Sequence, residues 1–152
     1  MSEVITEIDD RGVAWVRLNN PDKHNAFDDH IILQLTHAFA AVAANADVRV
    51  MVLCSEGKNF SAGADLDWMK RMATYSYDEN LRDASALALM LKTLNEIPQP
   101  TIARIQGPAF GGAVGLVSCC DMAVAASAAS FSLSEVKIGL VPATISPYVI
   151  AA

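Results

Sequence analysis

The sequence predicts an α/β domain whose strands are at least partly parallel. Segments with the two-residue alternation of strands are followed by segments with the three- and four-residue spacing of amphipathic helices, and this alternation continues along the chain. The chain has 152 residues, of which 53% are hydrophobic, so it can bury one core but is short for two ordinary domains. We therefore expect residues 1–152 to form a single domain.

The first half of the chain begins with a predicted β-hairpin. Residues 3–9 and 12–18 alternate apolar and polar side chains, and the DDRG between them has turn chemistry. A helix capped by Asp28 or Asp29 should follow, because its apolar positions recur at intervals of three and four: Ile32, Leu35, Phe39 and Val42. Residues 48–55 are rich in β-branched side chains, which is typical of a strand covered on both faces.

The second half continues the alternation of helices and strands. A short helix is predicted over residues 66–73, and a longer one over 78–97 should end at Pro98 and Pro100. A buried strand and then a glycine-rich turn into a helix are expected next. The last predicted elements are two extended segments and the start of a helix: residues 122–126, 130–141 and 144–152.

Composition and charge exclude several classes of function. The net charge of −6 comes with no basic stripe, which argues against a nucleic-acid partner. The odd cysteine count (Cys54, Cys119 and Cys120) fits neither a disulfide framework nor a zinc site and favours a reducing cytoplasm. The charged N-terminus and the lack of a run of about 18 apolar residues predict neither an export signal nor a membrane span.

Two loops of small residues follow predicted strands. NFSAGAD comes after one strand and QGPAFGGA after the next, and ligands of open α/β sheets bind beyond the carboxyl ends of strands. Small side chains let a ligand approach backbone N–H groups closely, so two such loops could hold an anion or a polarised carbonyl oxygen. Close packing of glycines at a strand-to-helix turn is the alternative interpretation.

Four segments resemble, in order and spacing, the motifs of the enoyl-CoA hydratase/isomerase (crotonase) family: NNPDKHNAF, KNFSAGADLDWM, RIQGPAFGGAVGLVSCCDMAVA and FSLSEVKIGLVP. Details of the last two are most similar to a bacterial subgroup of methylglutaconyl-CoA or isohexenylglutaconyl-CoA hydratases. The resemblance implies a ββα-repeat spiral fold, acyl-CoA thioester substrates, no cofactor beyond the CoA of the substrate, and a homotrimer or hexamer. The family's domain continues past SPYV into further helices, so we expect only the N-terminal core part here, with poor activity on its own.

The resemblance also implies roles for individual residues. The backbone N–H groups of Ala64 and Gly112 would be the two donors to the thioester oxygen. Lys23, Asn25 and Ala26 would lie beside the nucleotide end of CoA, and Ala62, Asp65 and Leu66 would line the adenine and pantetheine path. Lys23 is equally consistent with a solvated surface lysine, and Asp65 is also placed to cap the helix that follows it.

The carboxylates decide which reaction the resemblance implies. Typical hydratases of the family place one glutamate on each side of the double bond, and the second matches Glu135 while the first matches Gly115. A lone Glu135 could relay both protons of a hydration through one bound water, or could shift a Δ3 double bond to Δ2 as the sole base. Gly115 should leave room for a bulkier acyl chain. A non-catalytic acyl-CoA binder would need no acid, and a solvated loop residue is the alternative for Glu135.

The remaining polar and sulfur-containing residues suggest structural roles. No acid lies at ligand spacing from His24, His30 and His37, so we expect no metal. Cys119 and Cys120 lack an activating neighbour and are predicted to be buried, whereas Asp121 should tie down the backbone of the next strand. The helix residues Trp68, Met69 and Met72 either cover the acyl chain or pack into the core.

Overall fold

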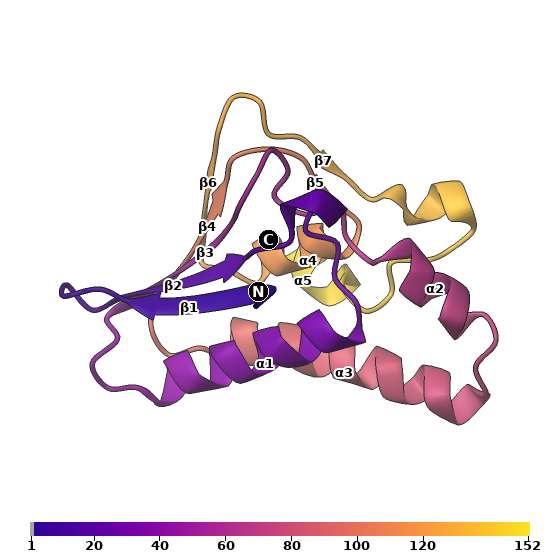
Figure 1. Cartoon of the computed structure of the whole chain (residues 1–152), viewed down its shortest axis with the longest axis horizontal. Coiled ribbons are helices and arrows are strands. Elements are labelled where there is room, and N and C mark those ends of the chain that lie inside the picture. Colours follow the sequence, from indigo (N-terminus) through magenta and orange to yellow (C-terminus); the bar gives the residue numbers. More distant parts are fainter. Residues whose placement is uncertain (1) are drawn as a thin grey trace.

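The computed structural model describes residues 2–152, and its centre is a five-stranded sheet with helices against one face (Figure 1). The strand order is β1-β2-β3-β4-β6. Only β1 and β2 are antiparallel, and all other neighbours are parallel. The predicted mixed α/β class is therefore confirmed. The bounds are β1 Val4–Ile8, β2 Val13–Leu18, β3 Val50–Ser55, β4 Thr101–Ile105 and β6 Met122–Ala125.

The predicted hairpin and first helix are both present. β1 and β2 pair through a turn in which Asp9 N–H donates to Val13 O at 3.0 Å. After the short 3-10 helix η1 (Pro21–Lys23), helix α1 runs over Asp29–Ala44. Of the two candidate caps, Asp28 is the N-cap, because its carboxylate accepts from the N–H groups of His30 and Ile31.

Helices α2 (Leu66–Met72) and α3 (Tyr77–Asn95) also lie where the sequence predicts them. A capping box fixes the start of α3, since Ser76 accepts from Glu79 N–H and the Glu79 carboxylate accepts from Ser76 N–H. The C-terminal half of α3 packs against α1 and the core through Met90, Leu91 and Leu94, which are all fully buried.

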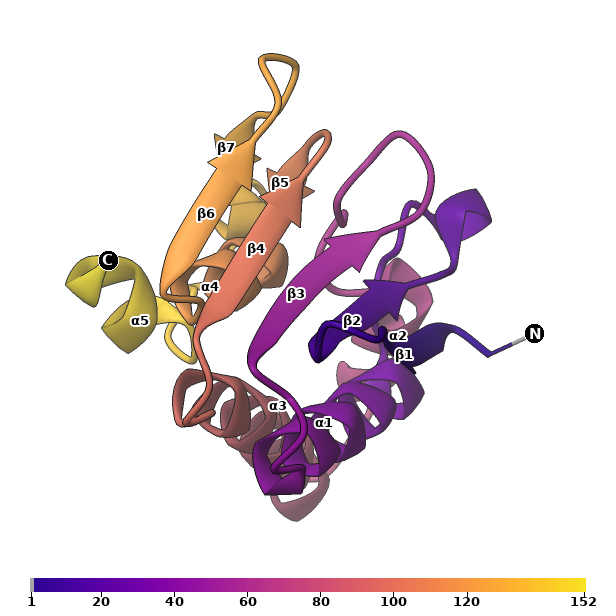
Figure 2. The same ribbon diagram turned by 90° about the vertical axis from the view of Figure 1, so that its left-hand side faces the viewer.

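The central strand β3 is buried on both faces, as predicted, but helices cover only one of them. Met51 and Leu53 belong to the main core. Val52 and Cys54 alternate with them along the strand and lie outside that core cluster, so they belong to the opposite face of the sheet. That face carries no helix in Figure 2. Trp15 and Arg17 of β2 stand in register beside Val52 and Cys54 on that face. Side chains of the adjacent strands therefore provide the cover that a second helical layer would give.

The C-terminal third departs from one prediction. Residues 130–141 were expected to be extended, but only β7 (Phe131–Ser132) is a strand, and Ser134–Ile138 form the 3-10 helix η2. β7 pairs only with the two-residue strand β5 (Ala109–Phe110), and the part of the chain that the structure describes offers no partner for a longer strand. Gly139 then ends η2 in the left-handed conformation, with φ of 73°.

Two further helices complete the structure: α4 (Gly112–Ser118), and α5 (Ser146–Ala151) in the predicted C-terminal position. All four residues of β6 are exposed. None of the helices in residues 2–152 is long and apolar enough to cross a membrane.

Candidate functional site

Short parallel pairings bring the two small-residue loops together beyond the ends of the sheet strands. Ser61 bridges to Ala109, and Phe110 N–H donates to Ser61 O at 3.0 Å. Gly63 sits directly against the second loop, because a Cβ built on it would lie 2.5 Å from Phe110 O and 3.4 Å from Gly112 N. Only glycine fits this approach, and its φ of +87° also favours glycine. Figure 2 shows β5 and β7 beyond the ends of β4 and β6.

The two predicted backbone donors are adjacent in this arrangement. Ala64 follows Gly63 directly, and the nitrogen of Gly112 is next to Gly63. Within residues 2–152, neither the Ala64 N–H nor the Gly112 N–H donates a hydrogen bond to a protein group. Two free N–H groups from different loops can therefore converge on one acceptor, which is the geometry that stabilises a developing oxyanion.

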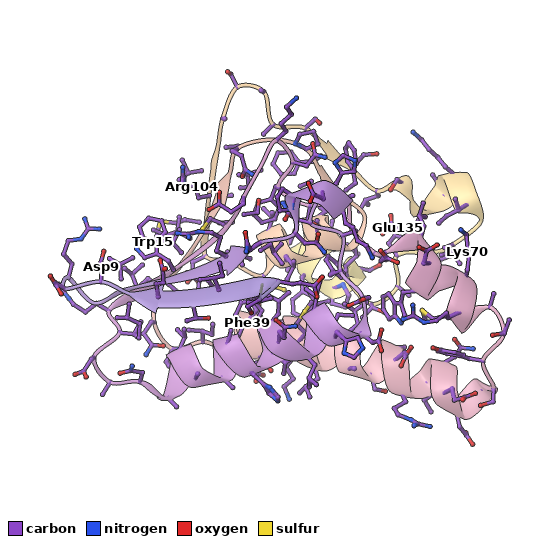
Figure 3. The ribbon with its side chains drawn as sticks, viewed as in Figure 1. Asp9, Trp15, Phe39, Lys70, Arg104 and Glu135 are labelled. Atoms are coloured by element: carbon purple, nitrogen blue, oxygen red, sulfur yellow. The ribbon has the colours of Figure 1, made fainter. Side chains whose placement is uncertain are left out.

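Glu135 lies beside the same glycine turn. β7 runs parallel to β5, and Gly111 N–H donates to Ser132 O at 2.9 Å, so the residues after β7 continue alongside Gly111. A Cβ built on Gly111 would lie 3.2 Å from Glu135 Oε1. Oε2 of Glu135 is buried and has no hydrogen-bond partner among the described residues. Figure 3 shows Glu135 at the end of the molecule that also carries Lys70, far from Asp9 and Trp15.

The space beside Gly115 is filled, contrary to the expectation that it would leave room for a larger acyl chain. A Cβ built on Gly115 would collide with Ile145 Cγ2 and lie 2.8 Å from Ile145 Cβ, with Leu91 Cδ2 at 3.5 Å. Gly115 itself is buried. The missing side chain at this position therefore accommodates α5 and the segment before it, since Ile145 precedes α5 directly.

Lys23 and Asp65 form an ion pair at the end of the first loop. Lys23 Nζ lies 3.7 Å from Asp65 Oδ2, and the lysine side chain is 59% exposed. The Asp65 carboxylate accepts from the N–H groups of Asp67 and Trp68, so it caps α2 as the sequence suggested. Hydrogen bonds from the Trp68 and Asp67 backbones, and the Lys23 charge, hold the Asp65 pKa below its usual value. Both interpretations of Lys23 remain compatible with this position.

Asn25 and Ser61 organise the loops from inside. The Asn25 amide is buried; its oxygen accepts from Asn20 N–H and its nitrogen donates to Glu56 O and Asn59 O. Ser61 Oγ donates to Asn25 O at 2.8 Å and accepts from Gly63 N–H at 3.1 Å. Sequence reasoning did not single out Ser61, although a serine two residues before a glycine is a recognisable signal for this local turn.

The other residues that the resemblance assigns to CoA binding surround this framework. Ala26 is buried, whereas Ala62 and Leu66 are exposed near the loop. Their assignment to a CoA path stays a prediction.

The cysteines, Trp68 and Asp121 pack or form hydrogen bonds within the fold, outside the two loops. Cys119 is buried as predicted, whereas Cys120 is only partly buried. Burial raises the pKa of both thiols to about 12. Of the two roles left open for Trp68, the structure shows packing into the core, where its Nε1 donates to Asp83 Oδ2. Asp121 Oδ2 accepts from the N–H and the hydroxyl of Thr101, so it fixes the start of β4 rather than the strand that follows it.

Neither the main hollow of the described residues nor a cluster of metal-binding side chains coincides with the two loops. A hollow of about 610 Å³ lies between α4, β6 and α5, and none of the predicted site residues lines it. Across residues 2–152, no group of three or more histidine, cysteine or acidic side chains is placed to hold a metal ion.

Comparison with known proteins identifies the class to which this fold and these loops belong. The profile of the family described as enoyl-CoA hydratase/isomerase matches residues 9–151. The chain therefore belongs to the enoyl-CoA hydratase/isomerase family.

Individual relatives cover both reactions in the family name. A solved enoyl-CoA hydratase from Shewanella pealeana is 46% identical, with a TM-score of 0.96 over 99% of this chain and 57% of that chain. An enoyl-CoA hydratase of Alternaria alternata is 37% identical over 91% of this chain and 45% of its own length. A peroxisomal Δ(3,5)-Δ(2,4)-dienoyl-CoA isomerase of Arabidopsis thaliana is 30% identical over 91% of this chain and 53% of its own. The chain thus spans about half the length of the curated relatives it matches.

Proposed function

We propose that this chain binds an acyl-CoA thioester and acts as a hydratase that adds water to the double bond of a 2-enoyl-CoA. The thioester oxygen would accept from the N–H groups of Ala64 and Gly112, and Glu135 would move the protons. The observation that carries the proposal is the buried Oε2 of Glu135, which has no hydrogen-bond partner among residues 2–152. The carboxyl group of Glu135 lies against Gly111, the residue before Gly112. A buried carboxylate oxygen without a protein partner is costly unless a ligand completes its interactions.

Hydration is chemically accessible to this arrangement. Electron density moves onto the thioester oxygen as hydroxide adds to C3, and two N–H donors stabilise the negative charge that develops there. Glu135 would take a proton from the attacking water and deliver a proton to C2, so that the elements of water are added and the carboxylate is regenerated. The substrate carries the CoA, so no separate cofactor takes part in this scheme.

Isomerisation is the second candidate, and one observation favours it. Position 115 is a glycine packed against Ile145, and α4 has no acidic residue, so this helix supplies no second carboxylate. One base that removes a proton from C2 of a 3-enoyl-CoA and returns it at C4 is sufficient for a double-bond shift.

The acyl chain and the assembly are further parts of the proposal. The motif details favour a methylglutaconyl type of acyl group, and family membership favours a homotrimer or hexamer in the cytoplasm. The filled space at Gly115 removes one reason to expect a bulky chain, so the assignment to methylglutaconyl-CoA depends on the motif resemblance.

A spectroscopic assay separates the candidates. The chain is incubated with a 2-enoyl-CoA, a 3-enoyl-CoA and methylglutaconyl-CoA while the absorbance of the conjugated thioester is followed. Loss of conjugation from the 2-enoyl substrates supports hydration, and gain of conjugation from the 3-enoyl substrate means isomerisation. Because poor activity is expected of the chain on its own, a full-length homologue is assayed beside it. Tight binding by calorimetry without turnover of any substrate by either protein would favour a non-catalytic acyl-CoA binder instead.

The matched variant for this assay is Glu135→Gln, which keeps the shape of the side chain. We expect it to retain binding and to lose turnover by about 10²- to 10⁴-fold, the usual contribution of a positioned acid or base. Unchanged turnover in Glu135→Gln would remove Glu135 from the mechanism.

A further inference from the structure

Phe27 contacts both loops that carry the backbone donors, and it does so with different parts of the residue. It lies between η1 and α1, and its side chain is completely buried. Its backbone forms a parallel bridge with Ala64 in the first loop, and its ring meets Gly112 in the second.

The backbone bridge fixes the direction of the Ala64 N–H. Phe27 N–H donates to Gly63 O at 2.9 Å, and Asp65 N–H donates to Phe27 O at 3.0 Å. Successive N–H groups of an extended segment point to opposite sides, so these two bonds turn the N–H of Ala64 away from Phe27. The first donor is therefore aimed by the backbone of Phe27.

The ring supports the second donor. A Cβ built on Gly112 would lie 2.7 Å from Cζ and 3.2 Å from Cε2 of Phe27, so the edge of the ring is in contact with the Gly112 backbone. The ring is held by the core below it, because Phe27 belongs to the main hydrophobic cluster. The position of Gly112 relative to Ala64 thus depends on one rigid aromatic side chain.

We propose that Phe27 is a positioning residue that sets the separation and direction of the Ala64 and Gly112 N–H groups. This inference rests on the proposed function, because it assumes that the two groups bind a thioester oxygen. Shortening the ring leaves the backbone bridge intact but removes the support under Gly112, so the second N–H should lose its alignment with the carbonyl oxygen. An interaction that strengthens as charge develops is more sensitive to such a shift than ground-state binding.

The test uses Phe27→Leu and a matched control, Phe39→Leu. Phe39 is also a completely buried phenylalanine of the main core, on α1 and outside both loops. The probe is a short saturated acyl-CoA labelled with ¹³C at the thioester carbonyl, whose NMR shift when bound reports how strongly the oxygen is polarised. Turnover is measured on the enoyl-CoA that the unsubstituted chain accepts.

We expect both variants to lose thermal stability, because both lose ring packing. Only Phe27→Leu should move the bound carbonyl shift toward its value in water and lower kcat by roughly 10- to 100-fold while KM stays within about threefold. An unchanged carbonyl shift in Phe27→Leu, or an equal change in Phe39→Leu, would overturn the positioning role.

Two further variants test the same contact, and the first of them, Gly112→Ala, keeps the proposal testable if Phe27→Leu does not fold. Gly112→Ala perturbs the same contact from the other side, because its methyl group would press on the ring, and it should also move the carbonyl shift. When Gly112→Ala is combined with Phe27→Leu, the smaller side chain leaves space for the added methyl group. The carbonyl shift and kcat of the double variant should therefore return part of the way to the values of the unsubstituted chain. A double variant whose carbonyl shift and kcat lie further from the values of the unsubstituted chain than those of either single variant would contradict the proposal. If the unsubstituted chain binds no acyl-CoA, the proposed function itself is wrong. If it binds acyl-CoA but Phe27→Leu leaves the carbonyl shift unchanged, only the positioning role of Phe27 is wrong.

Discussion

Ile145 stands where a side chain at position 115 would have to be, with its Cβ 2.8 Å from a Cβ built on Gly115. Gly115 is the position at which the family resemblance places the first glutamate of a typical hydratase. The two residues are thirty positions apart, and their contact joins α4 to the segment that leads into α5. Ile145 can therefore pack against α4 only because position 115 has no side chain, acidic or otherwise.

Restoring an acid at position 115 should damage the fold rather than improve hydration. We expect Gly115→Glu to lower the free energy of unfolding by about 1–3 kcal/mol or more, because the site is already packed. Urea denaturation checks this, and the enoyl-CoA assay should show no gain in hydration.

A double-mutant cycle isolates the contact between the two residues. Gly115→Ala combined with Ile145→Ala, which removes the colliding Cγ2, should be less destabilised than the sum of the single variants. Additive effects would show that Ile145 does not fill this space.

The close approach of the two loops depends on Gly63. We expect Gly63→Ala to cost about 1–3 kcal/mol of stability, since the methyl would meet Phe110 O at 2.5 Å and the backbone φ is +87°. Gly139→Ala is the matched control, because its φ is +73° but nothing lies within 4 Å of an added Cβ. The melting temperature of Gly63→Ala should fall further than that of Gly139→Ala. Equal losses would mean that backbone strain, not the contact between loops, determines the requirement for glycine.

Asp121 should matter for stability and not for the site. Its Oδ2 accepts from the Thr101 N–H at 2.7 Å and from the Thr101 hydroxyl at 2.9 Å. Asp121→Ala leaves these donors without their acceptor, so we expect a loss of about 1–3 kcal/mol by urea denaturation. Acyl-CoA affinity of the folded variant should be unchanged, and a weakened affinity would indicate that the start of β4 influences the loops.

The thiols of Cys119 and Cys120 should make the fold sensitive to alkaline pH. Burial, and for Cys119 also the neighbouring Cys120, raises their pKa to about 12 from an ordinary value of 9.0. The folded state therefore keeps protons that the unfolded chain releases, so stability is full below about pH 9 and falls as the pH rises toward about 12. Each thiol can contribute up to about 1.4 kcal/mol per pH unit in this window.

The measurement is the urea midpoint between pH 8 and pH 10.5. The variant with alanine at both cysteines should show a weaker pH dependence than the unsubstituted chain. An identical dependence would show that other groups cause the alkaline loss.

Local signals in the sequence predicted much of the fold because they act within a few residues. The alternation in β2, the apolar spacing of α1 and the capping carboxylates of Asp28 and Asp65 all correspond to hydrogen bonds or burial inside one element. The prediction for residues 130–141 was wrong, because alternating apolar residues specify a strand only where a partner strand exists. Here β5 offers two residues of pairing, and Gly139 closes a 3-10 helix.

In the candidate site, too, features encoded by local sequence could be predicted, whereas contacts between distant residues could not. The two glycine-containing loops and Glu135 could be selected from the sequence because motif spacing identifies them. The contact of Gly63 with Phe110, the packing of Phe27 under Gly112 and the filling of the Gly115 position by Ile145 join residues 30 to 85 positions apart. No local pattern encodes such contacts, so the expectation of free space at Gly115 failed.

The central proposal is that Glu135 reaches the C2 carbon of a thioester whose oxygen is held by the N–H groups of Ala64 and Gly112. The most direct test is exchange of the C2 protons of a saturated acyl-CoA with deuterium from solvent, followed by NMR with the unsubstituted chain and with Glu135→Gln. Exchange needs only a base and a polarised carbonyl, so it does not depend on whether the reaction is hydration or isomerisation. We expect exchange with the unsubstituted chain and its loss in Glu135→Gln with acyl-CoA binding retained. Exchange that persists in Glu135→Gln, or that is absent when the unsubstituted chain binds the acyl-CoA, would contradict this assignment.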